Sequence, residues 1–265
     1  LVSNPNTLVG LLLGAAVVFL FSGLAINAVT RAAGAIVFEV RRQFREHPGI
    51  MDGTEKPEYG RVVDICTRDS LRELATPGLL AALMPVAVGF GLGIGALAGF
   101  LAGAIGSGAL MAVFLANSGG AWDNSKKFVE DGAYGGKGSP AHEATVIGDT
   151  VGDPFKDTAG PSINPLIKVM NLVALLIAPA VVTMFLTEQT ALRLFIAALA
   201  TAVIVAAVII SKRRPIAVSP DEIADDIKDA DGHGPSSGEA AQLDEAVQEA
   251  AEDAGVPVPA EAGEK

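Results

Sequence analysis

Long uncharged apolar segments alternate with charged, polar segments along the chain. Residues 1–30 carry no charge, and no Asp, Glu, Lys, Arg or His occurs between residues 74 and 122. As one helix, the second segment would measure roughly 73 Å at about 1.5 Å per residue, more than twice the hydrocarbon core of a bilayer. We therefore expect this segment to turn back near residues 91–95 and to form two spans.

Two further apolar segments follow, one after Lys168 and one at residues 191–210. The pattern predicts an all-α fold, a polytopic transmembrane helix bundle that fills residues 1–215. Five spans are expected, at residues 7–38, 77–93, 96–122, 158–186 and 191–211. Two polar loops are expected between them, at residues 39–76 and 123–157. At the start of the third span, Gly95, just before it, and Gly99 and Gly103 within it repeat the small-xxx-small pattern that lets helices pack closely.

The composition agrees with a membrane protein, and the charge is concentrated at one end. Half of the residues are hydrophobic, and only 18% are charged. Residues 221–265 hold 14 of the 30 acidic and 2 of the 19 basic residues, so this segment carries −12 and the remainder +1. We expect residues 216–265 to form an acidic disordered tail. The single cysteine, Cys66, can form neither an internal disulfide nor a cysteine metal site.

The basic residues predict the orientation in the membrane. They gather in residues 31–72, 126–156 and 212–214, which five spans place on the same side, whereas the loops near Gly93 and Glu188 contain none. The positive-inside rule therefore predicts a multi-pass protein of the cell membrane, with the long loops and the tail in the cytoplasm. We expect lipid as a partner and no nucleic acid.

The candidate chemistry begins with three carboxylates. Asp149, Asp153 and Asp157 are four residues apart, so a regular helix would present them on one face in consecutive turns. Carboxylates that close repel one another, and a membrane-proximal setting makes unpaired charge costly. We interpret this acidic ladder as a site for cations, with divalent metal ions holding a phosphate-type ligand as the candidates. The alternative is an exposed acidic helix face.

A second polar cluster flanks the same loop. In it, Asp123 precedes Lys126 and Lys127 by about one helical turn. Taken alone, this cluster also fits a helix-end ion pair that anchors the chain at the membrane surface. Together, the two clusters suit an oxyanion held between Mg²⁺ and lysines, with a carboxylate that orients or deprotonates water. The sequence contains no P-loop, no Ser/His/Asp set and no Cys/His metal spacing.

Lys168 is a separate cation within the fourth span. A lone charge at that depth is costly unless it is paired, and the first, second and fifth spans offer no acidic residue. Either its side chain snorkels to the interface, or its partner lies on helices outside this chain. We favour the second interpretation.

The sequence resembles the membrane-integral, ion-pumping inorganic pyrophosphatases over approximately residues 4–179. The segments that carry the resemblance are EVRRQF, PGIMDG, KPEYGRVVDICT, NSGGAWDNSKKFVEDGA and GGKGSPAHEATVIGDTVGDPFKDTAGPSINPLIKVMN. The resemblance implies hydrolysis of Mg-pyrophosphate coupled to translocation of an ion, with H⁺ favoured over Na⁺ and no K⁺ requirement. It also implies a homodimer, and a larger bundle of which this chain is the C-terminal part. N-terminal helices of the full-length pump would complete the site, so the fragment alone is expected to be inactive.

The resemblance assigns roles to seven residues. Asp149, Asp153 and Asp157 would be catalytic and, with Asp123, would bind Mg²⁺. Lys126 and Lys156 would bind pyrophosphate, and Lys168 would belong to an ion gate. The last span and the acidic tail depart from the family pattern and receive no role from it. A secondary transporter or anion-binding membrane module remains the alternative function, and an interaction scaffold built on the tail is a third.

Overall fold

The computed structural model describes residues 3–214, so the predicted acidic tail lies outside the described residues. Every long element in the described part is helical, and no strand occurs there, which confirms the all-α prediction. The α-helices are α1 (Pro5–Glu46), α2 (Tyr59–Leu92), α3 (Ile94–Glu130), α4 (Pro140–Asp153), α5 (Gly160–Leu186) and α6 (Thr190–Arg213). Shorter elements are the 3₁₀ turns η1 (Pro48–Ile50) and η2 (Ala133–Gly135) and a π-helical turn, η3 (Pro154–Ala159).

Five of the described helical segments are long and apolar enough to cross a membrane, as expected. They are α1, α2, α3, α6 and the continuous segment from α4 through α5. The longest helices extend well beyond the predicted spans. Helix α3, for example, has 37 residues and therefore measures about 55 Å. The segments expected as loops, 39–76 and 123–157, are in consequence largely helical. The true connections are residues 47–58 and 131–139.

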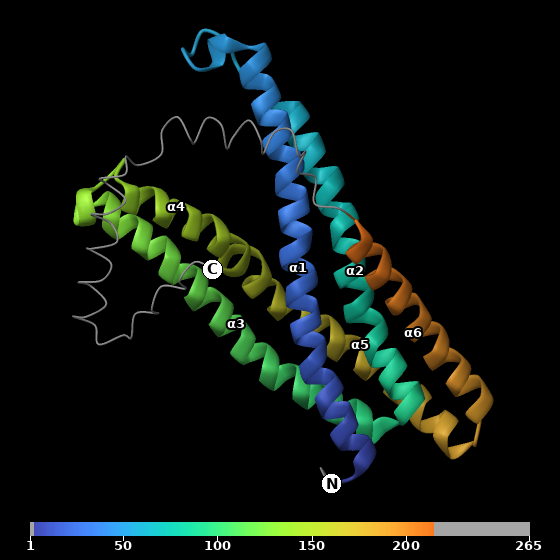
Figure 1. Ribbon diagram of the computed structural model, residues 1–265. Coiled ribbons are helices and arrows are strands. Elements are labelled where there is room, and N and C mark those ends of the chain that lie inside the picture. Colours follow the sequence, from blue (N-terminus) through green and yellow to red (C-terminus); the bar gives the residue numbers. More distant parts are fainter. Residues whose placement is uncertain (1–2, 215–265) are drawn as a thin grey trace, which may run out of the picture. The chain divides into compact units, whose positions relative to one another are not determined.

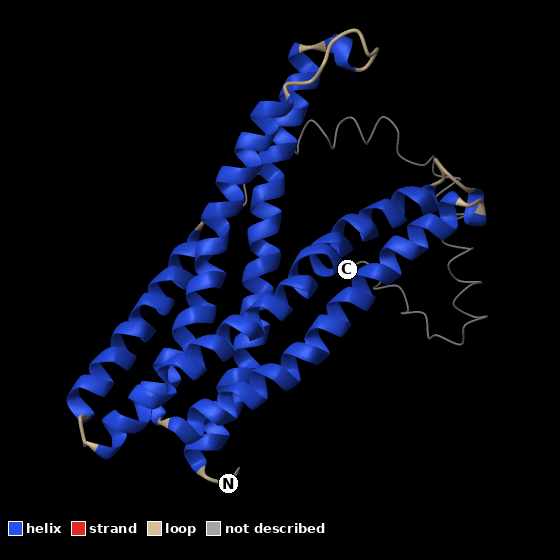
Figure 2. Cartoon of the chain, turned by 180° about the vertical axis from the view of Figure 1, so that it is seen from behind, coloured by secondary structure: helices blue, strands red, loops and turns tan. Residues whose placement is uncertain are grey.

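Charged pairs explain why the polar ends of the helices stay helical. Arg42 forms ion pairs with Glu39, three residues earlier, and with Glu46, four residues later. Such pairs lie on one face of a helix and support it in the absence of apolar packing. The polar ends of the α1–α2 hairpin and of the α3–α4 hairpin diverge from each other (Figures 1 and 2).

Close backbone contact joins α1 to α3 across their apolar halves. A Cβ atom added to Gly99 would lie 2.2 Å from the carbonyl oxygen of Thr7, and one added to Gly103 would lie 2.1 Å from that of Leu11. Only glycine permits this separation, so the predicted small-xxx-small contact is confirmed at both residues. Around the contact, α1, α2, α3 and α5 share an apolar core whose most buried side chains include Val18, Leu80, Phe100, Ile163 and Met170.

The opposite ends of the helices meet in tight turns. Gly93 connects α2 to α3 with φ of +97°, a conformation that favours glycine, and it lies in the predicted turn at residues 91–95. The ring of Phe185 lies under this turn, and the Arg193 guanidinium stacks 3.3 Å from the centre of that ring. The loops at this end lack basic residues, but Arg193 places one arginine in the first turn of α6.

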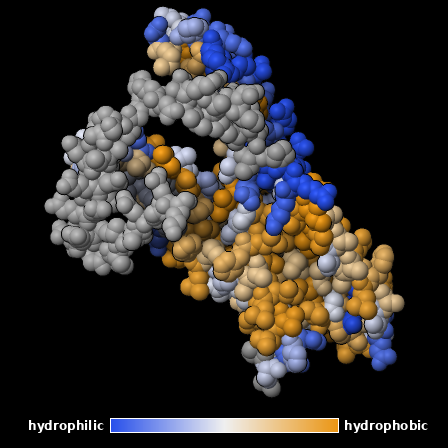
Figure 3. Space-filling model, in the orientation of Figure 1, coloured by the Kyte–Doolittle hydropathy of each residue, from blue (hydrophilic) through white to orange (hydrophobic). Residues whose placement is uncertain are grey.

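The last helix, α6, packs mainly along α2 (Figure 1). Apolar side chains cover the part of the surface over the lower halves of α2 and α6, whereas hydrophilic side chains lie along the upper part of the α1–α2 hairpin (Figure 3). On this face, the apolar surface thus lies over the halves of α2 and α6 that are expected to cross the membrane.

Candidate functional site

The candidate site begins with a close approach of α3 to α4. A Cβ atom added to Gly119 would lie 2.5 Å from the carbonyl oxygen of Gly152, so the two helix backbones touch. The Trp122 ring covers Gly152 and Gly148, and its centre lies 5.9 Å from that of the Phe155 ring. These glycines therefore serve helix packing. The sequence interpretation missed that role, although the spacing of four residues between Gly148 and Gly152 is a small-xxx-small signal.

This approach brings the two predicted polar clusters together. Lys156 donates a hydrogen bond of 2.5 Å to Asp123, and Lys126 donates a short one to Asp149. Each pair joins a residue of α3 to a residue of the segment formed by α4 and η3. Lys127, on the exposed side of α3, also reaches Asp123 at 3.2 Å. The six residues expected around the substrate, Asp123, Lys126, Asp149, Asp153, Lys156 and Asp157, thus form one continuous ionic cluster.

Lys156 is the centre of this cluster. Its Nζ atom lies within 4 Å of four carboxylates, at 2.5 Å from Asp123, 3.3 Å from Asp153, and 3.9 Å from each of Asp149 and Asp157. The repulsion expected within the ladder is therefore compensated inside the chain, by lysines. Counting Asp123, Asp149, Asp153 and Asp157 against Lys126, Lys127 and Lys156 leaves a formal charge of −1, so the cluster keeps a net attraction for cations.

The ladder is less regular than its spacing predicts. Asp149 and Asp153 lie on α4, but Pro154 opens the π-helical turn η3, which also contains Asp157. A π turn is wider than an α turn, so it changes the direction in which the third carboxylate projects. The side chain of Asp149 is 10% exposed, that of Asp153 50% and that of Asp157 63%. One carboxylate is thus buried in the helix contact, and two face outward.

Asp149 carries the feature that points to a ligand. Its Oδ2 atom accepts from Lys126, but its buried Oδ1 atom has no hydrogen-bond partner. Buried polar atoms are nearly always satisfied, so an open carboxylate oxygen here suits a group that joins the site from outside. Carboxylate oxygens are the protein ligands that Mg²⁺ prefers. Over residues 3–214, however, no three acidic, His or Cys side chains converge closely enough to hold a metal ion.

The connection between α3 and α4 is closed by two residues that the sequence interpretation did not single out. His142 Nδ1 accepts from the Gly138 backbone amide at 3.3 Å, which leaves the ring proton on Nε2, 3.1 Å from a Glu130 carboxylate oxygen. Ser139 caps α4 by accepting from the His142 amide. These contacts hold the end of α3 against the start of α4, at the polar end of the α3–α4 hairpin that carries the ionic cluster.

Lys168 lies apart from the cluster. It is exposed on α5, and residues 3–214 provide it with no ion pair or hydrogen bond. Asn164, one turn earlier, is also exposed. The assignment of Lys168 to an ion gate remains a prediction, as do the individual roles of the six clustered residues.

Comparison with known proteins identifies the family. The profile of the family described as inorganic H⁺ pyrophosphatase matches residues 1–177. The chain is 74% identical over 233 residues to the K⁺-insensitive pyrophosphate-energized proton pump of Streptomyces avermitilis, and 72% identical over 226 residues to the pump of the same description in Streptomyces coelicolor. These alignments cover 87% and 84% of this chain but 29% and 28% of the relatives.

A further relative differs in its described ion. A putative K⁺-stimulated pyrophosphate-energized sodium pump of Bacteroides thetaiotaomicron is 54% identical over 175 residues, which cover 66% of this chain and 24% of that protein. The chain therefore spans less than a third of the length of each of these pumps. The five apolar helical segments, the ionic cluster and the profile match all agree with this family. The chain belongs to the inorganic H⁺ pyrophosphatase family of membrane proteins.

Proposed function

We propose that this chain forms one wall of a Mg-pyrophosphate site in a pump that couples pyrophosphate hydrolysis to proton translocation. The observation that carries the proposal is the position of Lys156, whose amine is surrounded by four carboxylates. Such an arrangement holds a substrate-binding cation in place before the substrate arrives. The described names of the relatives, all of them pyrophosphate-energized pumps, support the choice of substrate.

The lysines and carboxylates exchange partners when substrate binds. Lys126 and Lys156 move their charge from aspartates to the phosphate oxygens, for which ammonium groups are suitable point charges. Asp123, Asp149 and Asp153 would hold Mg²⁺ through their carboxylate oxygens, among them the Oδ1 atom of Asp149 that has no hydrogen-bond partner. Mg²⁺, when bound, neutralises charge that develops on the transferred phosphoryl group.

The exposed carboxylates of Asp153 and Asp157 bind the water molecule that attacks pyrophosphate. Asp153 and Asp157 present about half or more of their side-chain surface outward, so each can accept a hydrogen bond from a water molecule. A carboxylate in that position orients the water and accepts its proton as the new P–O bond forms, while the bridging P–O bond of pyrophosphate breaks and the second phosphate leaves. Residues from the remainder of the pump complete the site, and the chain alone is inactive.

Coupling to ion movement follows from the continuity of η3 and α5. Lys156 and Asp157 lie in η3, and Lys168 lies on the helix that continues from it. A change in the partners of Lys156 is therefore passed to Lys168 along one continuous helical segment, which contains Pro165 between the two lysines. We assign Lys168 to an ion gate, with H⁺ as the ion and no requirement for K⁺. The polar helix ends face the cytoplasm, and the pump is a homodimer.

Release of phosphate by the full-length pump tests this function. In isolated membranes, Asp153→Asn should abolish Mg-dependent pyrophosphate hydrolysis and proton uptake together. Asp131→Asn is the matched control, because Asp131 is an exposed carboxylate just past α3 and outside the cluster. Normal hydrolysis in the Asp153 variant would contradict the site assignment. Pyrophosphate binding without phosphate release in the parent protein would instead favour an anion-binding or transport module.

A further inference from the structure

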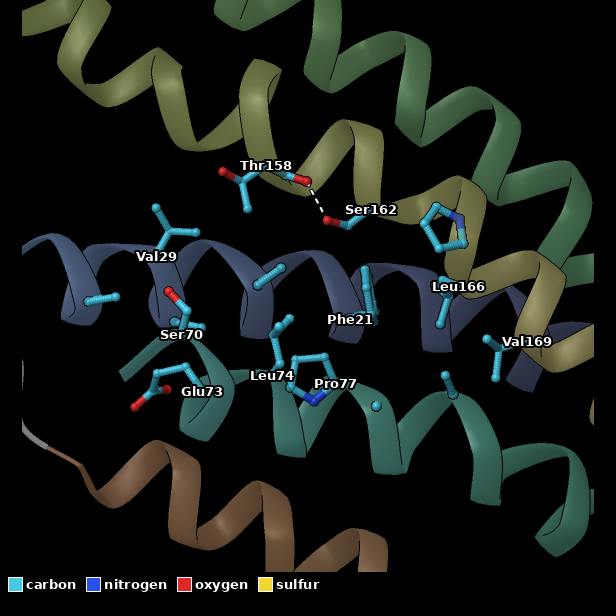
Figure 4. A pocket seen from close by; sticks show the side chains of 16 residues that line it. Phe21, Val29, Ser70, Glu73, Leu74, Pro77, Thr158, Ser162, Leu166 and Val169 are labelled. Atoms are coloured by element: carbon cyan, nitrogen blue, oxygen red, sulfur yellow. Dashed lines mark hydrogen bonds between the residues drawn. The ribbon is translucent and has the colours of Figure 1, made fainter. Parts of the chain in front are cut away.

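Two adjoining cavities lie away from the ionic cluster. The first, of about 410 Å³, lies between α1, α2 and α5 and is lined mainly by apolar side chains, including Phe21, Leu74 and Leu166 (Figure 4). The second, of about 310 Å³, is lined by Arg31, Arg72, Arg214, Asp69 and Glu73, together with two alanines. Ala32 and Glu73 line both cavities, so the apolar space opens beside the arginine-rich one.

The charges of the second cavity do not cancel. Glu73 accepts hydrogen bonds from Arg31 at 2.5 Å and from Arg214 at 3.2 Å, so one carboxylate serves two guanidinium groups. Asp69 forms an ion pair with Arg68, which does not line the cavity. Arg72 has no hydrogen bond or ion pair within residues 3–214. Three arginines therefore face two carboxylates, and the lining retains a charge of +1 that suits a single monoanion.

The depth of the two cavities along the helices suggests an amphiphile. Arg72 and Glu73 precede the second predicted span, residues 77–93, by about one turn, and Arg214 follows α6 directly. The apolar cavity continues past them along Pro77 and Ala81 of α2 and Val169 of α5, within the spans. The charged cavity is thus at the level of the membrane interface, and the apolar cavity reaches toward hydrocarbon depth.

We propose that the joined cavities bind one anionic glycerophospholipid, with its phosphate at Arg72 and an acyl chain in the apolar cavity. Arg31 and Arg214 are held at the phosphate by Glu73, and the volumes are in the range of small-molecule sites. Basic pockets between transmembrane helices on the cytoplasmic side are typical sites for acidic lipid headgroups. Arg214 lies beyond residues 1–177, so α6 adds this site to the part that the family profile describes.

Two variants and one control test the lipid site in the full-length pump. Arg72→Gln removes the surplus cation, whereas Arg68→Gln removes a neighbouring arginine that is 74% exposed and does not line the cavity. Gly78→Leu fills the apolar cavity, because a Cβ atom there meets no atom within 4 Å. Leucine also favours helix over glycine, so this variant should fold.

Native mass spectrometry of the detergent-solubilised pump, titrated with phosphatidylglycerol or phosphatidylcholine, provides the measurement. The parent and Arg68→Gln should each bind one phosphatidylglycerol per chain in preference to phosphatidylcholine. Arg72→Gln should weaken that binding by about tenfold, the value of one hydrogen bond to a charged group, and Gly78→Leu should abolish it. The proposal would be overturned by equal binding of the two lipids or by unchanged binding in both variants. It would also be overturned if no lipid bound because another helix of the pump fills the space. Hydrolysis is not the readout, so the result is independent of the proposed catalysis.

Discussion

The helix contact at Gly152 should control the geometry of the ionic cluster, and Gly152→Ala tests that control with a single methyl group. An added Cβ atom would lie 2.9 Å from Cε3 of Trp122, and 3.1 Å from both the Cα and the carbonyl oxygen of Gly119. Optimal contacts between non-bonded carbon atoms are about 3.5–4.0 Å. Helix α4 must therefore withdraw from α3 by about 0.5–1 Å.

This displacement acts on the ion pairs that cross the contact. Lys156 and Asp123 are bridged at 2.5 Å from opposite helices, as are Lys126 and Asp149. Overpacking costs about 1–3 kcal/mol, while replacement of glycine by alanine within a helix returns about 1 kcal/mol. Stability should therefore fall by at most about 2 kcal/mol. Misplacement of catalytic groups by about 1 Å lowers rates by up to about 100-fold, so hydrolysis should fall by about 10- to 100-fold.

Gly120→Ala is the matched control for this variant. Gly120 neighbours Gly119 on α3, but a Cβ atom there meets no atom within 4 Å. Pyrophosphate hydrolysis by the two variants of the full-length pump, measured at saturating Mg²⁺ beside their thermal unfolding, separates geometry from stability. Equal activity in the two variants would refute the conclusion that the glycine contact positions the site.

Three further predictions concern the contact between α1 and α3, the ion pairs of Glu73 with Arg31 and Arg214, and the binding of Mg²⁺. Gly103→Val should lower the unfolding temperature sharply, because its Cβ atom would lie 2.1 Å from the Leu11 carbonyl oxygen, whereas Gly106→Val meets nothing within 4 Å; similar unfolding temperatures would contradict the α1–α3 contact. Glu73→Gln should destabilise the protein by about 3–5 kcal/mol, because it breaks a largely buried ion pair and leaves Arg31 and Arg214 uncompensated. Thermal unfolding compared with the exposed Glu55→Gln variant checks this, and equal unfolding temperatures would show that Glu73 does not hold the end of α6 against α1 and α2. Asp149→Asn should raise the Mg²⁺ concentration needed for half-maximal hydrolysis, and an unchanged Mg²⁺ titration would remove Asp149 from the ligand set.

The number and order of the spans could be predicted because bilayer thickness imposes one physical length on each apolar segment. The turn at Gly93 follows from the same reasoning, whereas the glycine contact at Gly103 was predicted from its small-xxx-small spacing. The limits of the helices could not be predicted from hydropathy, since α1 and α3 continue into the polar segments. Charge pairs such as Glu39–Arg42 maintain those extensions, and hydropathy does not register them.

The membership of the candidate site could be predicted from residue types, but its internal contacts could not. Spacing suggested three equivalent carboxylates, whereas η3 and the helix contact make Asp149 buried and Asp157 exposed. Position along the sequence also gave no sign that Lys156 would reach Asp123 from another helix. Pairings of that kind depend on the crossing of α3 with α4, which is determined by packing at Gly119 and Trp122.

Lys156 is the residue to test first, because its amine lies within 4 Å of all four carboxylates of the cluster. The measurement is phosphate release from Mg-pyrophosphate by the full-length pump carrying Lys156→Met, compared with Lys137→Met, which removes an exposed lysine from the connection between α3 and α4. Hydrolysis should be lost in the Lys156 variant and normal in the Lys137 variant. Equal rates in the two variants would contradict this prediction.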